Sequence, residues 1–214
     1  MPSPRPTGLL LASVGVSTLA LLLLTKVGED VFEHESSLFD NGVRVWMLGQ
    51  RTLSLFTVFT WISAAGAVWP MIAFTAAVVI WLWRSERRRA AACAIAAPAA
   101  ALALFSLIKL AFARSRPPGA LHFALRSFAF PSGHATMSTT VAATIAYILW
   151  RERLLDGRVG LVVAVLIPLL VGGSRIYLDV HWATDVIGGW CLGLLISAVA
   201  ATVYEGLHGS VPSR

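Results

Sequence analysis

A small group of polar and charged residues interrupts the apolar C-terminal part of the chain: Ser174, Arg175, His181 and Asp185. Charges among long apolar runs are costly in lipid, so we expect these side chains to face one another or a watery cavity. His181 and Asp185 are four residues apart, which places them on one face of a helix, where the carboxylate can hydrogen-bond the imidazole. Such a bond fixes the tautomer and raises the basicity of the other ring nitrogen, as a nucleophilic histidine requires. The planar guanidinium of Arg175 suits a phosphate group.

Two earlier blocks fit the same chemistry: Lys109 with Arg116, and the Ser132, Gly133 and His134 of the tetrapeptide PSGH. A phosphate ester needs its anionic oxygens neutralised, its phosphorus attacked and its leaving oxygen protonated. Lys109 and Arg116 supply positive charge, and arginine can bind phosphate in a bidentate fashion. Ser132 and Gly133 begin a predicted helix, whose free amides bind anions, and a glycine lets a phosphate approach closely.

The three blocks together resemble the signature of the type-2 phosphatidic acid phosphatase superfamily, a family of integral membrane lipid phosphatases. That signature reads KxxxxxxRP, PSGH and SRxxxxxHxxxD. Here the blocks stand as KLAFARSRP, PSGH and SRIYLDVHWATD, so every fixed position is matched. A single four-residue match is weakly specific, whereas three blocks in order with matching internal spacing are strongly specific.

The resemblance implies a role for each matched residue. His181 attacks phosphorus and becomes a phosphohistidine, Asp185 orients it, and His134 acts as general acid. The phosphate-binding residues implied in the same way are Lys109, Arg116, Ser132, Gly133, Ser174 and Arg175. Neither a cofactor nor a metal is implied, because the carboxylates are too few for a two-metal site and the cations can do the work of a metal.

Taken singly, most of these residues have ordinary structural explanations. Lys109 and Arg116 could be snorkelling residues at the end of a span. Arg175 could be a span-end anchor, His134 an interface histidine and Asp185 a helix N-cap. Their joint spacing is what favours a site.

Four other residues near the blocks are interpreted without a catalytic role. Arg114 and Arg126 are predicted to be solvated loop charges, and Trp182 an aromatic residue of the membrane interface. Asp179 could tune the choice of substrate or simply face water.

The composition is that of an integral membrane protein. Hydrophobic residues make up 57% of the 214 residues and charged residues 13%, against about 25% charged in soluble domains. We expect an all-α fold with one domain over residues 1–214. Cys93 and Cys191 lie in apolar runs, which favours buried thiols over a disulfide or a metal site. The net charge of +6 suits an anionic membrane surface or substrate, and its scattered distribution argues against nucleic acid.

Six apolar runs predict a bundle of six transmembrane helices, over residues 8–25, 69–83, 90–113, 132–150, 159–178 and 184–204. The first run could be a signal peptide, but it shows no small-residue cleavage site and further spans follow, so it is interpreted as a span. Residues 41–64 have apolar residues at helical spacing and predict an amphipathic interfacial helix between the first two spans. The alternative is that they form the first half of a long kinked span.

The distribution of Lys and Arg predicts the orientation. Nine lie in the N-terminus, in 84–89, in 151–158 and in the C-terminal tail, and eight lie on the other side. Three of those eight are Lys109, Arg116 and Arg175, so five remain against nine. Because cytoplasmic loops hold the excess of Lys and Arg, both termini are expected in the cytoplasm. The loop 114–131 and the turn 178–183, with the active site, then lie on the extracytoplasmic face of the inner (plasma) membrane.

The predicted function is hydrolysis of a lipid phosphate or diphosphate held in the membrane. Undecaprenyl diphosphate is the favoured substrate, because an outward-facing site suits a carrier whose diphosphate is released on that face. Phosphatidylglycerol phosphate, phosphatidic acid and lipid A phosphates are the alternatives. A vanadate-dependent haloperoxidase and a non-catalytic membrane protein such as a transporter are the competing classes. The sequence leaves the oligomeric state open.

Overall fold

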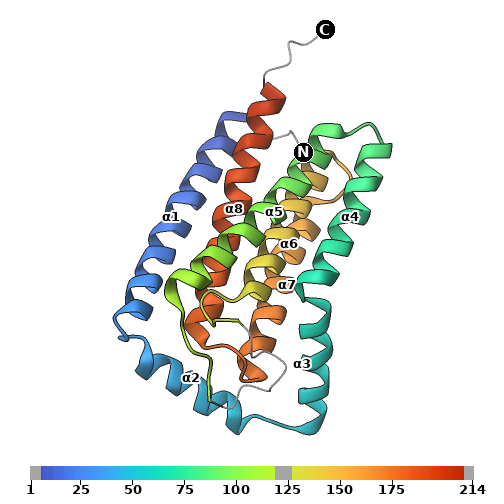
Figure 1. The fold of residues 1–214 in the computed structure, drawn as a ribbon. Helices are drawn as coiled ribbons and strands as arrows, with labels where there is room; N and C mark the ends of the chain where they lie inside the picture. Colours follow the sequence, from blue (N-terminus) through green and yellow to red (C-terminus); the bar gives the residue numbers. More distant parts are fainter. Residues whose placement is uncertain (1–5, 119–126, 210–214) are drawn as a thin grey trace.

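The computed structural model describes residues 6–118 and 127–209 of the chain. This part of the chain is built of helices and contains no strand, so the all-α prediction is confirmed. The helices are α1 (Pro6–Phe32), α2 (Ser37–Gly49), α3 (Leu53–Ala65), α4 (Val68–Arg84), α5 (Arg88–Phe112), α6 (Gly133–Arg151), α7 (Gly157–Tyr177) and α8 (Ala183–Gly209) (Figure 1).

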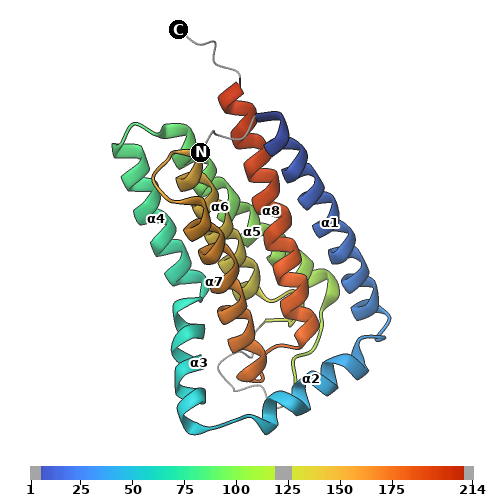
Figure 2. The ribbon, with the colours of Figure 1, turned by 180° about the vertical axis from the view of Figure 1, so that it is seen from behind.

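The long helices stand side by side, whereas the short helix α2 lies across one end of the bundle (Figure 1). The start of α1 and the end of α8 lie at the opposite end, as do the turns between α4 and α5 and between α6 and α7 (Figures 1 and 2). These two turns hold the basic runs 84–89 and 151–158. The bundle therefore has one basic end and one end closed by α2.

Within the described residues, four helices are long and apolar enough to cross a membrane: α1, α5, α7 and α8. Helices α3 and α4 meet the same standard together, as a pair bent by 49°. Large apolar side chains on the outside of the bundle, such as Leu11 and Leu22 of α1, are exposed. A surface of this kind is suited to lipid, so the protein is an integral membrane protein.

Helix α6 differs from the other long helices because it is rich in Ser and Thr. It packs against α4, α5, α7 and α8, and its Thr136, Ser138, Thr139 and Thr140 are buried. A helix enclosed by other helices can hold polar side chains without exposing them to lipid. The count of six spans, which needs α6 as one of them, stays a prediction.

The segment predicted as one interfacial helix, residues 41–64, forms two helices. Helix α2 ends at Gly49, and α3 begins after Thr52, whose hydroxyl accepts the amide of Leu55 at 3.2 Å as an N-cap. Because α3 and α4 together are long and apolar enough to cross a membrane as a bent pair, α3 fits the alternative of a kinked span, which stays a prediction. Only α2 matches the shape expected of an interfacial helix, and its place in the membrane stays a prediction.

Glycines on α8 bring its first turns close to α6. A Cβ at Gly189 would lie 2.8 Å from the carbonyl oxygen of Ser132, and one at Gly193 would lie 2.9 Å from that of Thr136. Small residues let helix backbones approach in this way in membrane bundles. The close approach sets the start of α6, which holds the PSGH block, beside the start of α8, which holds Asp185.

Candidate active site

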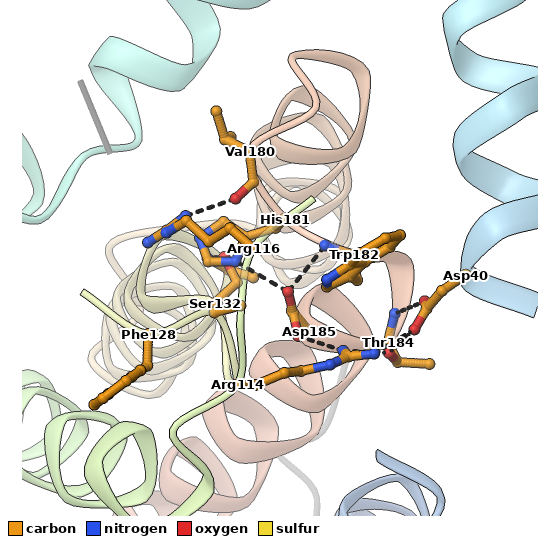
Figure 3. A network of polar contacts seen from close by, with 12 residues as sticks. Asp40, Arg114, Arg116, Phe128, Ser132, Val180, His181, Trp182, Thr184 and Asp185 are labelled. Atoms are coloured by element: carbon orange, nitrogen blue, oxygen red, sulfur yellow. Dashed lines mark hydrogen bonds and ion pairs between the residues drawn. The ribbon is translucent and has the colours of Figure 1, made fainter. Parts of the chain in front are cut away.

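The three sequence blocks meet at the end of the bundle that α2 closes. The amide of Ser132 donates to the carbonyl oxygen of Asp185 at 2.9 Å, which joins the second block to the third. Arg116 of the first block lies against His181, with 3.0 Å between Nη1 and Nε2 (Figure 3). The structure therefore brings together the segments that the sequence analysis assigned to one site.

His181 is 3% exposed, and both of its ring nitrogens have partners. Nδ1 lies 3.3 Å from Oδ2 of Asp185, the contact expected from the four-residue spacing, although His181 lies in the turn before α8 and not in the helix. Nε2 faces Arg116 (Figure 3). Because a carboxylate can only accept, the ring hydrogen is assigned to Nδ1 and the lone pair to Nε2. Oδ2 of Asp185 also accepts the amide of Trp182 at 2.9 Å, which restricts rotation of the carboxylate.

Burial and neighbouring cations keep the His181 ring neutral. Loss of water around the ring lowers the pKa of His181 well below its ordinary value, and the positive charges of Arg116, Arg175 and Lys109 lower that pKa further. A neutral imidazole with its lone pair on Nε2 is the state that a nucleophilic histidine needs at neutral pH.

Lys109, Arg116 and Arg175 form a cationic cluster around this ring. The charges of all three act on His181, and those of Arg116 and Arg175 act on Lys109. Within residues 6–118 and 127–209, none of the three forms an ion pair, because the nearby carboxylate of Asp185 is paired with Arg114 instead. Cations gathered at a buried place repel one another, and an anion bound among them relieves that repulsion.

The cationic groups of the cluster bond to neutral atoms. Lys109 Nζ donates to the carbonyl oxygen of Phe128 at 2.5 Å, and Arg116 Nη1 donates to that of Val180 at 2.6 Å. Arg175 donates through Nη1 to the hydroxyl of Ser63, and its buried Nε has no acceptor in the described part of the chain. An unpaired, buried guanidinium donor is a group that a phosphate oxygen would satisfy.

The start of α6 supplies further donors. The hydroxyl of Ser132 caps the helix by accepting the amide of Ala135 at 3.5 Å, while the amides of Gly133 and His134 have no acceptor among the described residues. Free amides of this kind bind anions. Packing also favours glycine at position 133, because a Cβ there would lie 3.1 Å from the ring of Phe105.

The remaining two predicted residues differ in their surroundings. His134 is half-buried, and the charges of Arg175, Arg116 and Lys109 act on it, which places it beside the cationic cluster. Ser174 is buried, and its hydroxyl donates to the carbonyl oxygen of Val171 in its own helix at 2.6 Å. A role of Ser174 in phosphate binding stays a prediction.

Sequence analysis missed two residues that the structure ties to the dyad of His181 and Asp185. Arg114, interpreted as a solvated loop charge, donates to Oδ1 of Asp185 and to Oδ2 of Asp40, each at 2.6 Å (Figure 3). That interpretation is wrong for Arg114, because only 16% of its side chain is exposed, and Arg126 lies outside the described residues. Asp40 lies on α2, far from Asp185 in the sequence. The only hint of its role in the sequence is that it is the one carboxylate in the amphipathic segment that forms α2.

Asp179 and Trp182 also have defined partners. Asp179 is buried and receives two bonds from Arg44 of α2, at 2.7 and 2.8 Å, so it does not face water. The indole Nε1 of Trp182 donates to the carbonyl oxygen of Ser115 at 3.0 Å, and its ring lies beside the guanidinium of Arg114. In the described residues, no three His, Cys, Asp or Glu side chains gather in a metal-binding arrangement.

The sequence of the chain matches a known protein family. Residues 90–208 match the PAP2 superfamily, and this match includes all three sequence blocks. The chain belongs to the PAP2 superfamily. This confirms the resemblance to type-2 phosphatidic acid phosphatases that the three blocks indicate.

Curated phosphatases and diphosphatases resemble the chain in sequence. Phosphatidylglycerophosphatase B of Bacillus subtilis (strain 168) is 44% identical over 73 residues, which is 33% of this chain and 36% of that protein. The putative undecaprenyl-diphosphatase YbjG of Escherichia coli (strain K12) is 34% identical over 146 residues, 64% of this chain and 69% of that protein. The matched part thus spans about a third of the first relative and about two thirds of the second.

A solved PAP2 structure resembles this fold over nearly its whole length. It is the crystal structure of a transmembrane PAP2-type phosphatidylglycerolphosphate phosphatase from Bacillus subtilis, with a TM-score of 0.76 and 25% sequence identity. The likeness covers 94% of this chain and 97% of that one. It therefore includes α1 to α4, which lie outside the family match.

Proposed function

We propose that the chain is a membrane lipid phosphatase that works through a phosphohistidine on His181. The observation that most supports this is the neutral His181, whose Nδ1 is held by Asp185. Its Nε2 lies among three cations that have no ion-pair partner in the described part of the chain. Such a cluster fits the dianionic phosphate of an ester, and its central group is a nucleophile.

The first half of the reaction transfers the phosphoryl group to the enzyme. Nε2 of His181 attacks phosphorus, so an N–P bond forms as the bond between phosphorus and the leaving oxygen breaks. The bound phosphate dianion offsets the cations beside His134, so this ring can carry a proton. His134 donates that proton to the leaving oxygen, and the lipid leaves as an alcohol or as a monophosphate. Asp185 balances the positive charge that develops on the His181 ring.

The second half releases phosphate. His134, now neutral, takes a proton from a water molecule as that water attacks phosphorus, and the N–P bond breaks. Lys109, Arg116 and Arg175 hold the phosphate oxygens in both halves, with the free amides of Gly133 and His134 as further donors. Ser132 keeps those amides in place by capping α6.

The site is proposed to face the extracytoplasmic side of the membrane. It lies at the end of the bundle opposite the two basic turns, and cytoplasmic loops hold the excess of Lys and Arg. In this arrangement α1, the bent pair α3–α4, α5, α6, α7 and α8 form six spans, with both termini in the cytoplasm and α2 at the interface.

Undecaprenyl diphosphate is the proposed substrate, hydrolysed to undecaprenyl phosphate. Support comes from the Escherichia coli relative, whose name gives this activity and which matches over most of its length. Phosphatidylglycerol phosphate is the second candidate, because the names of the curated Bacillus subtilis relative and of the solved Bacillus subtilis structure both give it. Phosphatidic acid remains the third, since the phosphate-binding residues would meet any phosphate at the same depth.

A panel assay tests this function. The purified chain, in detergent, is given each of the three lipids, and release of inorganic phosphate is measured beside a His181→Ala control. We expect turnover of at least one lipid, loss in the control, inhibition by vanadate, and full activity in excess EDTA because cations of the protein neutralise the phosphate. Absence of turnover for every lipid, or loss on chelation restored by Mg²⁺, would contradict the proposal.

A further inference from the structure

We propose that Arg114 and Asp40 are positioning residues for the dyad of His181 and Asp185, and that α2 contributes to the site through them. Neither residue is part of the three sequence blocks. The inference deepens the proposed function and rests on it for its chemical meaning, while its geometry is independent of any substrate.

Arg114 joins two buried carboxylates. Its Nη1 donates to Oδ1 of Asp185 and its Nη2 to Oδ2 of Asp40, each at 2.6 Å, and these carboxylates are 0% and 1% exposed. The planar fork of a guanidinium fixes the directions of both bonds. With Oδ1 taken by Arg114, the other oxygen of Asp185 is left for His181 (Figure 3).

The balance of charge explains why two carboxylates share one arginine. If Arg114 faced Asp185 alone, its positive charge would offset that of the carboxylate, and Asp185 would support a positive His181 ring poorly. Asp40 offsets the charge of Arg114 instead, so Asp40, Arg114 and Asp185 together keep one net negative charge beside His181. Without Arg114, two buried carboxylates would repel each other, and one would bind a proton.

Asp40 also fixes the helix turn on which Asp185 stands. Its Oδ1 accepts the amide of Thr184 at 2.9 Å, and its Oδ2 accepts the Thr184 hydroxyl at 2.7 Å. Thr184 lies in the first turn of α8, where amides lack partners within the helix and a negative charge is favoured. Asp40 thus acts as an N-cap supplied by another helix.

The chain contains a matched control. Arg44 and Asp179 also join α2 to the turn between α7 and α8 through two short bonds, and Asp179 is 2% exposed. The side chain of Asp179 bonds to Arg44 and not to His181 or Asp185. Asp179→Asn therefore removes a buried ion pair on the same helix and the same turn without touching the dyad.

Kinetics form the first test, with Arg114→Ala, Asp40→Asn and the control Asp179→Asn. We expect kcat to fall about 10- to 100-fold in the first two, by analogy with the loss when hydrogen-bond partners that orient metal-ligating histidines are removed, with KM within about twofold. The control should keep kcat within about twofold of wild type. Where Arg114→Ala does not fold, Arg114→Lys replaces it, because one ammonium cannot span both carboxylates.

Chemical rescue separates positioning from a general loss of structure. Arg114 lines a cavity of about 540 Å³ between α1, α2 and the segment after α5, so a small cation can reach its place. Guanidinium at low concentration should restore part of the kcat of Arg114→Ala, and sodium at equal ionic strength should not. In the double variant Asp40→Asn/Arg114→Ala, guanidinium should restore nothing.

The His181 ring provides a readout that does not depend on activity. Its Nδ1 hydrogen, held by Asp185, should give a downfield proton resonance that disappears in His181→Gln and in Arg114→Ala but stays in Asp179→Asn. Retention of both kcat and this resonance in Arg114→Ala and Asp40→Asn would overturn the inference. If the wild type turns over no lipid phosphate, the proposed function fails, and the resonance alone decides whether Arg114 positions the ring.

Discussion

Nε2 of His181 lies 3.0 Å from Nη1 of Arg116, so the nitrogen proposed to attack phosphorus contacts a cation proposed to bind its oxygens. Arg116 is fixed by further bonds, to the carbonyl oxygen of Val180 and to the carbonyl oxygen and hydroxyl of Ser127. The guanidinium is therefore held beside the nucleophile before a substrate binds, and the N–H that faces Nε2 turns to a phosphate oxygen to free the lone pair for attack.

Arg116→Lys tests whether this fixed geometry matters beyond charge. Lysine keeps the positive charge but loses the planar fork, so it cannot reproduce the bonds to Val180 and Ser127 together. We expect kcat/KM to fall by about 100-fold, the usual loss when one such donor is removed. Steady-state kinetics on the best lipid of the panel measure this, and an unchanged kcat/KM would mean that only the charge of Arg116 is used.

His181→Ala and His134→Ala should differ in kind. Loss of the nucleophile should lower kcat by at least about 10⁴-fold for every substrate. Loss of the general acid should matter less for an ester whose leaving group needs no proton, such as a nitrophenyl phosphate. Rapid quenching should trap phosphoenzyme in His134→Ala and none in His181→Ala, and equal loss on all esters in His134→Ala would assign the acid elsewhere.

The pH dependence follows from the lowered pKa of His181. Since attack needs the neutral ring, activity is lost as pH falls through this pKa, and a pKa below the ordinary value moves that loss to lower pH. Arg116→Gln removes one of the charges that lower the pKa, so its acid limb should lie at higher pH than that of wild type. Profiles of kcat/KM from about pH 5 to about pH 8 on one substrate compare the two. A limb that stays in place would show that the ring is not the titrating group.

Sequence reasoning found the helices and the three blocks because both follow from local patterns. Apolar runs gave α5 and α7 nearly to their ends, and the four-residue spacing gave the contact between His181 and Asp185. The break between α2 and α3 was missed, because the apolar spacing continues across the N-cap at Thr52.

The positions of Asp40 and Arg114 depend on contacts between segments far apart in the chain. No local pattern shows that a carboxylate of α2 meets an arginine that follows α5, so Arg114 was interpreted as a solvated charge and Asp40 was given no role. A search for a partner of every charge near a bundle end would have asked which carboxylate pairs with Arg114. Several carboxylates were available as its partner. Only the packing of α2 across the bundle end selects Asp40 among these carboxylates.

A pair of exposed glutamates in turns at opposite ends of the bundle tests the orientation. Glu35 lies beside α2 and Glu86 in the basic turn after α4, and the two native cysteines are buried. A membrane-impermeant thiol reagent applied to intact cells should label Glu35→Cys and leave Glu86→Cys unlabelled until the membrane is opened. The reverse pattern would place the reaction in the cytoplasm.

The last prediction is that the lipid reacts without leaving the bilayer. The site lies where α5, α7 and α8 begin or end, which corresponds to the depth of lipid head groups if these helices span the membrane. The phosphate can then reach Arg116 and His181 while the tail remains beside the apolar outer surface of the bundle. A lipid already held at this depth has a higher local concentration and fewer orientations than a dissolved ester.

We therefore expect kcat/KM for undecaprenyl diphosphate to exceed that for glucose 6-phosphate by at least about 100-fold in matched detergent, the factor that about 2.8 kcal/mol of binding gives. Phosphatidylglycerol phosphate and phosphatidic acid, measured in parallel, separate access from head-group choice. Equal values for the soluble ester and the lipids would contradict access through the bilayer. A clear preference for a glycerophospholipid over the polyprenyl diphosphate would contradict the proposed substrate. It would not contradict access through the bilayer, because all three lipids place a phosphate at the same depth.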